Sequence, residues 1–341
     1  MKAIQLALLL LLLMWGVAGA EQPNFSSGVT NCDTIADLRA KGDKGEAEAQ
    51  LNPGASYGLG QNTAQNPVEA FEWYRKAARQ GNVFAQNNLA VCYANGRGVA
   101  KDEIQAVKWY RLAAEQNLAQ AQFNLGCCYA NGQGVTQDTT EAVKWFRKAA
   151  EQGHALAQCN LGSIYREGRG VPQNFAEAVK WWRKAADQNL AVAQYSLGAC
   201  YHDGIGVAKD EVEMVRWWRK AADQNLAIAQ CGLGVCYANG QGVTQDTVEA
   251  VKWIRKAAEQ GCAQGQYNLG ACYFNGVGVP KDYIEADKWI NLASAQGLEL
   301  ARSILTIDEQ QMTPKQIAEG QRLAREFRPH KESGSDNSTP P

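Results

Sequence analysis

Apolar residues recur along this chain in a pattern that repeats every 36 residues. In one repeat, Ala157, Leu161 and Tyr165 follow one another at steps of four, which is the spacing of one face of a helix. After a polar break that contains glycines, Trp181 and Ala185 mark the apolar face of a second helix, in which large residues are set against small ones. The pattern predicts two helices per repeat, which we call helix A and helix B.

Two aromatic positions keep the same period without a slip, a tyrosine in helix A and a tryptophan in helix B. A fixed period of this length is typical of proteins whose units bury their apolar faces against their neighbours. The sequence therefore predicts a repeat array with these rings in its core, while the Lys and Arg residues of helix B, such as Lys180 and Arg183, face water. The tyrosines are Tyr57, Tyr93, Tyr129, Tyr165, Tyr201, Tyr237 and Tyr273, and the tryptophans are Trp73, Trp109, Trp145, Trp181, Trp217, Trp253 and Trp289.

Polar residues and glycines mark where the predicted helices begin and end. Each repeat opens with Gly or Asn, which tolerate the left-handed backbone of a helix C-terminus, and helix A ends in four repeats at the turn signal Asn-Gly-x-Gly. At the start of helix B, Asp or Asn precedes Glu or Gln by three residues, which predicts a capping box. The opening residues are Gly45, Gly81, Asn117, Gly153, Asn189, Asn225, Gly261 and Gly297, and the capping pairs are Asn66/Glu69, Asp102/Gln105, Asp138/Glu141, Asn174/Glu177, Asp210/Glu213, Asp246/Glu249 and Asp282/Glu285.

The succession of A-x-A-Q-x-x-L-G-x-x-Y, G-x-G-V and D-x-x-x-A-x-x-W-x-x-x-A-A resembles the Sel1-like repeat, a relative of the tetratricopeptide repeat. The resemblance covers residues 45 to 305 and joins spacing, glycines, caps and aromatic positions. It implies an all-α fold, a right-handed α-α superhelical solenoid of Sel1-like, TPR-like helix pairs in which helices A line a concave face. It also implies a non-catalytic scaffold or adaptor that binds protein or peptide partners on that face.

The repeats divide the chain into five segments. An apolar stretch followed by the small residues Ala18-Gly19-Ala20 predicts an export signal, so we expect a periplasmic or secreted protein. Near the other end, Thr313, Pro314 and Gln316 predict a capped helix that seals the last repeat. The segments are 1–20, the signal peptide; 21–44, a lead with a short capping helix at 35–41; 45–296, seven repeats; 297–329, a partial repeat and C-terminal capping helix; and 330–341, a disordered tail.

The charge balance argues against one class of partner. The chain has 34 Lys and Arg residues and 35 Asp and Glu residues, which gives a formal net charge of −1. This balance provides no basic surface of the kind that nucleic acid requires. No segment outside the signal approaches membrane-spanning length, so we expect no membrane insertion after signal removal. The mature protein is expected to be a monomer that selects a protein or peptide partner by shape and local chemistry.

Residues for catalysis or metal binding are sparse. Only His154, His202 and His330 are present, and the serine motif G-x-S-x-G is absent. The motif G-x-G-V follows a helix rather than a strand, so we interpret it as a turn and not as a phosphate loop. The adjacent tryptophans at 181/182 and 217/218 could form an aromatic cage, but their period favours core packing. The sequence predicts no catalytic residue, no metal site and no cofactor.

Ten cysteines are the main puzzle, because an exported protein normally uses them in disulfides. Five of them precede the repeat tyrosine, a position where another repeat has Ile164, and so they are interpreted as small core residues. Equivalent positions in adjacent repeats lie roughly 8 to 10 Å apart, whereas a disulfide needs Cα atoms within about 7 Å. We therefore expect mostly free, buried thiols, with Cys32 and Cys262 the least explained. The five are Cys92, Cys128, Cys200, Cys236 and Cys272.

The family resemblance implies a different pairing, in which a cysteine at the end of helix B joins one at the start of the next helix A. Here Cys159 and Cys231 match the second position, while Ala and polar residues fill the first. Half of that pair is therefore missing from this chain.

Two neighbouring positions of helix A form the candidate partner-binding surface. One carries a ladder of asparagines, which we expect to present amides along the groove or to bond loop backbone of the neighbouring repeat. The position before it varies between repeats, and its large aromatic residues either contact a partner or pack between adjacent helices A. The predicted partner-binding residues are Asn88, Phe123, Asn124, Asn160, Tyr195, Tyr267 and Asn268; Asn52 belongs to the same ladder, which Ser196 and Gly232 interrupt.

An enzymatic function is the alternative. Cysteine-rich Sel1-type proteins are associated with penicillin binding and β-lactam hydrolysis, and the resemblance implies such an activity as a second hypothesis. No set of nucleophile, base and oxyanion hole can be recognised in the sequence to carry it. The scaffold is the favoured interpretation.

Overall fold

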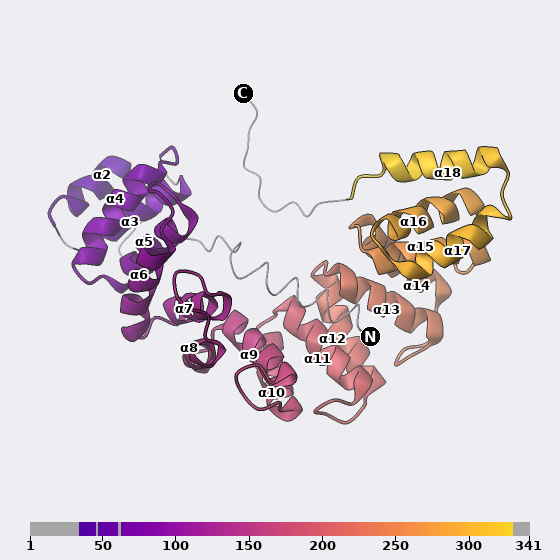
Figure 1. Cartoon of the computed structure of the whole chain (residues 1–341), viewed down its shortest axis with the longest axis horizontal. Coiled ribbons are helices and arrows are strands. Elements are labelled where there is room, and N and C mark those ends of the chain that lie inside the picture. The colour runs from indigo at the N-terminus through magenta and orange to yellow at the C-terminus, as the bar shows by residue number, and fades with distance from the viewer. Residues whose placement is uncertain (1–33, 46, 61–62, 330–341) are drawn as a thin grey trace. The chain divides into compact units, whose positions relative to one another are not determined.

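The computed structural model describes residues 34–45, 47–60 and 63–329, apart from the side chains of 306–309. Over these ranges there are seventeen helices and no strand, which confirms the predicted all-α fold (Figure 1). The chain forms two compact units, Met1–Trp181 and Trp182–Pro341, and packing is described within each. The predicted signal at 1–20, Cys32 and the predicted tail at 330–341 lie outside the described residues.

The helices alternate between the two predicted types. In the repeats whose packing is described, helix A packs against the helix B that follows it, and helix B packs against the next helix A. The A helices are α3 (Ala47–Leu59), α5 (Val83–Asn95), α7 (Ala119–Asn131), α9 (Ala155–Glu167), α11 (Ala191–Asp203), α13 (Ala227–Asn239) and α15 (Ala263–Asn275). The B helices are α4 (Pro67–Arg79), α6 (Glu103–Glu115), α8 (Thr139–Glu151), α10 (Phe175–Asp187), α12 (Glu211–Asp223), α14 (Thr247–Glu259) and α16 (Tyr283–Ala295).

Three further helices flank the repeats, and the predicted capping helices are both present. α2 (Ile35–Gly42) packs against α3, and α18 (Pro314–Glu326) packs against α16. α17 (Glu299–Glu309) lies in the predicted partial repeat and packs against α16. The ring of Phe327, which follows α18, meets Trp289 of α16 edge-on at 5.2 Å between centroids. Gly320 of α18 lies directly over the buried Asp287, since a Cβ on this glycine would stand 2.4 Å from Asp287 Oδ2. The C-terminal helix therefore covers the last helix B.

Left-handed backbone follows every helix B, as predicted. Asn117 has φ of 68° after α6, and Gly153 has φ of 92° after α8. Asn is enriched at positive φ among residues that carry a side chain, and Gly is unrestricted there. The alternation between Asn and Gly at the repeat boundary thus follows from the backbone turn that joins helix B to the next helix A.

The prediction of capping boxes at the B helices was only half right. In α8, Asp138 Oδ1 accepts from the Glu141 amide at 3.0 Å, as predicted. The Asp138 amide, however, donates to the carbonyl of Tyr129 at 2.9 Å, and Glu141 instead pairs with Lys144 at 2.8 Å. In every repeat the backbone amide of the N-cap residue donates to the carbonyl of the preceding tyrosine. This amide is therefore not available to donate to the side chain three residues later. The complete box is present at α18, where the Thr313 amide does donate to Gln316 Oε1 at 2.9 Å.

The lattice tryptophans lie in the core, but the basic residues beside them do more than face water. Lys180 is exposed as predicted. The expectation for Arg183 was wrong, because its Nη2 donates to the hydroxyl of Tyr201 at 2.5 Å. Arg147 bonds Tyr165 in the same way at 2.6 Å, and the corresponding arginines of α6, α12 and α14 repeat the contact. Arginines of helix B therefore hold the tyrosine of the next helix A.

A buried glutamine ties successive B helices together. Gln122, which is 2% exposed, donates from Nε2 to the carbonyl of Ala114 at the end of α6. Its Oε1 accepts from Gln152 at the end of α8, at 2.7 Å. Equivalent pairs are Gln50/Gln80, Gln86/Gln116, Gln194/Gln224, Gln230/Gln260 and Gln266/Gln296. The glutamine of the sequence motif is thus a structural residue at each repeat boundary.

The motif G-x-G-V forms a turn, which confirms the structural interpretation. Gly134, its second glycine after α7, has φ of 67° and lies against the first turn of α6. A Cβ at this position would stand 2.1 Å from the carbonyl oxygen of Glu103. Gly98, Gly242 and Gly278 approach the preceding helix B equally closely. Glycine is required here because two backbones touch.

We expect Gly134→Ala to destabilise the repeats more than Gly153→Ala. Both substitutions place alanine at positive φ, at a cost of about 1–2 kcal/mol. Only Gly134→Ala adds a clash with backbone, because the space around Gly153 is open to 4 Å. Overpacking of this kind costs about a further 1–3 kcal/mol. Urea unfolding followed by circular dichroism measures the difference, and equal midpoints for the two variants would contradict the close-approach argument.

Candidate functional site

The A helices present a surface that is nearly free of charge. Four of them, α5, α7, α13 and α15, contain no Asp, Glu, Lys, Arg or His, whereas every helix B carries at least three charged residues. We define the A-helix face as the ladder position and the position one helical turn before it. In the first unit this face comprises Glu48, Asn52, Phe84, Asn88, Gln120, Asn124, Leu156 and Asn160, and in the second it comprises Val192, Ser196, Ile228, Gly232, Gln264 and Asn268. Glu48 of α3 is the one charged residue among them.

Two of the ladder asparagines, Asn124 and Asn268, bond to side chains of the neighbouring helix A, and not to loop backbone as the alternative expected. Asn124 Nδ2 donates to Asn87 Oδ1 at 3.1 Å, across the contact between two repeats. Asn268 Nδ2 reaches Cys231 Sγ at 3.4 Å in the same way. Asn88 is 7% exposed and its Nδ2 has no hydrogen-bond partner among the described residues, while Asn160 is half-buried. The ladder positions are therefore not equivalent.

The predicted aromatic residues lie largely inside the array. Phe123 is 7% exposed and stacks on His154 with 4.7 Å between ring centroids. Tyr195 is 4% exposed and stacks on Trp218 at 5.6 Å. Tyr267 is half-buried against the apolar cluster around α16. In this structure Phe123 and Tyr195 therefore pack between helices. The role of all three rings in partner binding stays a prediction.

A contact that sequence reasoning missed joins the variable position to the residue that caps the next helix A. His154 is the N-cap of α9: its Nδ1 accepts from the Ala157 amide at 3.2 Å, and its Nε2 bonds Gln120 Oε1 at 2.8 Å. Because Nδ1 accepts, Nε2 carries the proton. Burial lowers the pKa of His154 to about 4. Aligning the capping residues at the 36-residue step would have singled out this position, which is Leu in most repeats.

No disulfide joins the described cysteines, and most of them are buried. Burial raises the pKa of Cys92, Cys159 and Cys236 to about 12, so these thiols remain protonated at neutral pH. They are the inert, core-packed thiols that the sequence pattern indicated. Cys262, which that pattern left unexplained, caps α15 and is half-buried.

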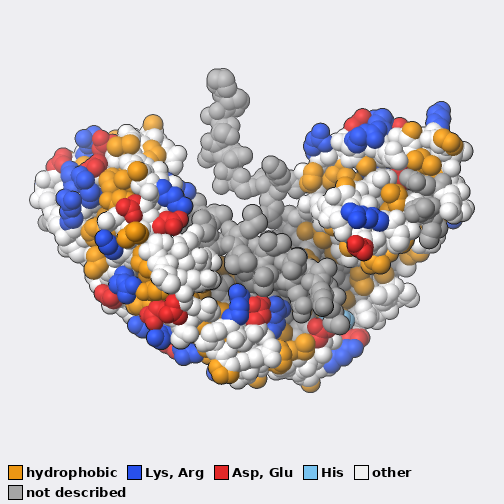
Figure 2. All heavy atoms as spheres, viewed as in Figure 1, with side chains coloured by type: hydrophobic (Ala, Val, Ile, Leu, Met, Phe, Trp, Pro, Cys, Tyr) orange, Lys and Arg blue, Asp and Glu red, His pale blue; other side chains and the backbone are white. Residues whose placement is uncertain are grey.

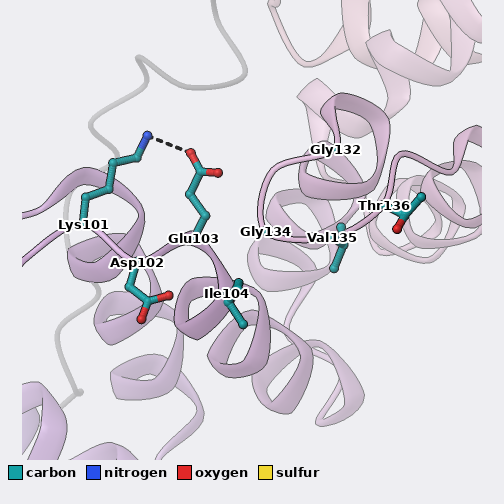
Figure 3. Close-up of a pocket in the computed structure, with 8 residues that line it drawn as sticks. All are labelled: Lys101, Asp102, Glu103, Ile104, Gly132, Gly134, Val135 and Thr136. Atoms are coloured by element: carbon teal, nitrogen blue, oxygen red, sulfur yellow. Dashed lines mark ion pairs between the residues drawn. The ribbon is translucent and has the colours of Figure 1, made fainter.

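One pocket of about 780 Å³ lies between the first turn of α6 and the turn after α7 (Figure 3). Lys101 and Glu103 on its rim form an ion pair of 2.7 Å, and Asp102 caps α6. Its other lining residues are Ile104, Gly132, Gly134, Val135 and Thr136. The two carboxylates of the pocket are therefore already engaged in structural contacts.

Charge is dispersed over the surface that Figure 2 shows, where basic and acidic side chains are interspersed within each unit. Pairs such as Lys144–Glu141 and Lys252–Glu249 lie on B helices. Within the described ranges no cluster of three His, Cys, Asp or Glu residues could hold a metal ion. No described helix is both long and apolar enough to cross a bilayer.

The stacked A and B helices define the protein as an all-α repeat solenoid. The chain belongs to the Sel1 repeat family, as the motif resemblance predicted. The Sel1 repeat matches seven consecutive segments, beginning two residues after the predicted boundaries. These are residues 47–82, 83–118, 119–154, 155–190, 191–226, 227–262 and 263–298.

The solved structure of a Sel1 repeat protein agrees with this assignment. The chain is similar to a Sel1 repeat protein from Oxalobacter formigenes, with 35% sequence identity and a TM-score of 0.65; the match covers 80% of this chain and 79% of that one. It is also similar to a protective antigen present in uropathogenic Escherichia coli strains, which displays an SLR fold, at 27% identity and a TM-score of 0.42 over 86% of this chain and 94% of that one. No match is found among curated proteins.

We expect the stability of the protein to fall as the pH drops from about 6.5 to about 4, partly because of His154. In the folded protein burial lowers its pKa from 6.5 to about 4, so the neutral ring stabilises the fold above pH 6.5 and this contribution is lost as the pH falls through the folded value. The contribution is at most about 3 kcal/mol. Asn82, at the equivalent position of another repeat, caps α5 with its side chain. The variant His154→Asn therefore keeps a capping side chain but removes the titratable ring.

The measurement is the unfolding midpoint of wild type and His154→Asn between pH 4 and pH 8. The variant is expected to lose less stability at acid pH than wild type, because Asn caps the helix without titrating. A constant difference between the two proteins across this range would exclude His154 as a source of acid sensitivity.

Proposed function

We propose that this protein is a non-catalytic scaffold that binds a neutral segment of a partner protein along the A-helix face. Sel1 repeats usually mediate protein–protein interaction. The observation that carries the proposal for this chain is the absence of charged side chains from α5, α7, α13 and α15, next to B helices that are rich in charge. This is the face that the family resemblance predicts to line the concave side of the solenoid.

Amide and small side chains suit this face to an uncharged peptide. Asn and Gln offer both donors and acceptors, which match the amide and carbonyl groups of a peptide backbone. From α5 onward, a partner that covers the face would not have to desolvate an ion there, so it avoids the large penalty of burying unpaired charge. Phe84, which is 37% exposed, and the half-buried Leu156 add apolar contact area in the first unit.

The proposal also gives the cellular setting that the sequence suggests. The apolar start of the chain and its small-residue cleavage site support export, with partner binding in the periplasm or outside the cell. The partner is accordingly sought among exported proteins.

The experiment captures partners on the immobilised mature protein and then compares two lysine variants. Asn160→Lys places a charge on the A-helix face, and Thr140→Lys places the same charge on the exposed side of α8. We expect Asn160→Lys to weaken partner binding at least about tenfold, or roughly 1.4 kcal/mol, because the charge must be desolvated in the complex. Isothermal titration with the captured partner measures the effect.

The matched control decides between a specific face and general charge effects. Thr140→Lys is expected to bind as wild type does, and circular dichroism should show both variants fully helical. Unchanged binding by Asn160→Lys together with lost binding by Thr140→Lys would place the partner on the B helices and overturn the proposal.

A further inference from the structure

Cys231 and Cys262 occupy the two positions that meet where one helix A packs on the next. Cys231 holds the variable position of α13, and Cys262 is the N-cap of α15, the helix A of the following repeat. The two helices are in direct contact. Phe123 and His154 are the corresponding pair in the first unit. At the other capping positions the residues are Asn82, Leu118, His154, Leu190, Leu226 and Leu298, so this junction alone in the sequence has cysteine at both positions.

The two thiols are held together by a defined set of contacts. Their side chains face each other closely enough that each thiol shifts the pKa of the other. Asn268 Nδ2, from the next turn of α15, donates to Cys231 Sγ at 3.4 Å. The Cys262 thiol makes no cap bond of ordinary geometry, but the backbone amides of Gln264 and Gly265 lie close enough to favour a negative charge on it. A helix N-terminus stabilises a thiolate in this position.

The pair divides into an attacking and a resolving thiol. The facing Cys231 thiol and the backbone amides lower the pKa of the half-buried Cys262. The facing Cys262 thiol, together with burial, raises the pKa of Cys231, which is 4% exposed. A partly exposed thiolate reacts first with an oxidant, and a protected neighbouring thiol then displaces the bound group.

A purely structural role does not account for this arrangement. Cys159 holds the same variable position as Cys231 and is fully packed, with its pKa raised by burial alone. Cys272 is half-buried like Cys262, yet its pKa is raised, and burial alone is the cause. In Cys159 and Cys272 burial raises the thiol pKa, so these two cysteines serve as internal references for Cys231 and Cys262.

We propose that Cys231 and Cys262 are a redox-active dithiol that a small-molecule disulfide oxidises to an intramolecular disulfide between α13 and α15. The Cys262 thiolate attacks one sulfur of the small disulfide, whose S–S bond breaks and releases one thiolate. Cys231 then loses its proton to solvent and attacks Cys262 Sγ, which releases the second thiolate. Two protein thiols are oxidised by two electrons, and one small disulfide is reduced to two thiols.

The test exposes the full mature protein to oxidised glutathione, quenches free thiols and maps disulfides by peptide mass spectrometry. Wild type is expected to give the Cys231–Cys262 cross-link. Cys231→Ala is expected to retain glutathione on Cys262, because the resolving thiol is gone. Cys262→Leu, which restores the residue found in sister repeats, is expected to leave Cys231 unmodified.

Alkylation by iodoacetamide provides a second readout that does not depend on oxidation. Cys262 is expected to react about tenfold faster than Cys272 at neutral pH, since a larger fraction of it is thiolate. Equal rates for the two half-buried cysteines would overturn the proposal. So would glutathione on Cys262 of wild type that never resolves to the cross-link.

Discussion

The stacking of the repeats depends on one buried group, the side-chain amide of the motif glutamine, which must find hydrogen-bond partners inside the core. Gln122 lies in the first turn of α7 and its side chain is buried in the core. An unpaired side-chain amide there would reduce the stability of the fold by about 1–3 kcal/mol. It meets this requirement with the carbonyl of Ala114 at the end of α6 and with Gln152 at the end of α8. Asn117 Oδ1 accepts from both glutamines, at 3.1 and 3.2 Å. Because these groups end two successive B helices, the spacing of the repeats follows from the bonds of one side chain.

That spacing determines which residues are available for recognition. Large rings are used for stacking: Trp145 is buried beneath Lys148, whose Nζ lies 4.3 Å from the ring centroid, and Phe123 packs on His154. Most charged side chains of the repeats belong to the B helices and their caps, with exceptions such as Glu48 in α3 and Arg166 in α9. The A-helix face is left with amides and small residues such as Asn160. Its neutrality is therefore a consequence of how the helix pairs stack, and it suits a neutral peptide.

The junction between successive A helices is where individual repeats differ chemically. The same pair of positions holds an aromatic stack of Phe123 on His154 in one unit and the two facing thiols of Cys231 and Cys262 in the other. Burial disfavours protonation of His154, whereas the neighbouring Cys231 thiol and the first-turn amides of α15 favour ionisation of Cys262. Leucine at this position in sister repeats shows that stacking alone does not require a polar group there.

The sequence by itself determined the features that depend on neighbouring residues. The period, the helix pairs, the left-handed residue at Asn117, the turn at Gly134 and the full box at Thr313 all rest on local backbone preferences, and each was predicted. The structure decided which distant groups meet, because those contacts exist only once helices stack. In the structure the Asp138 amide donates to a tyrosine carbonyl, and Arg183, which was expected to face water, bonds to Tyr201. Stacking also buried predicted contact residues and brought the Cys231 and Cys262 thiols together, which no spacing along the chain could show.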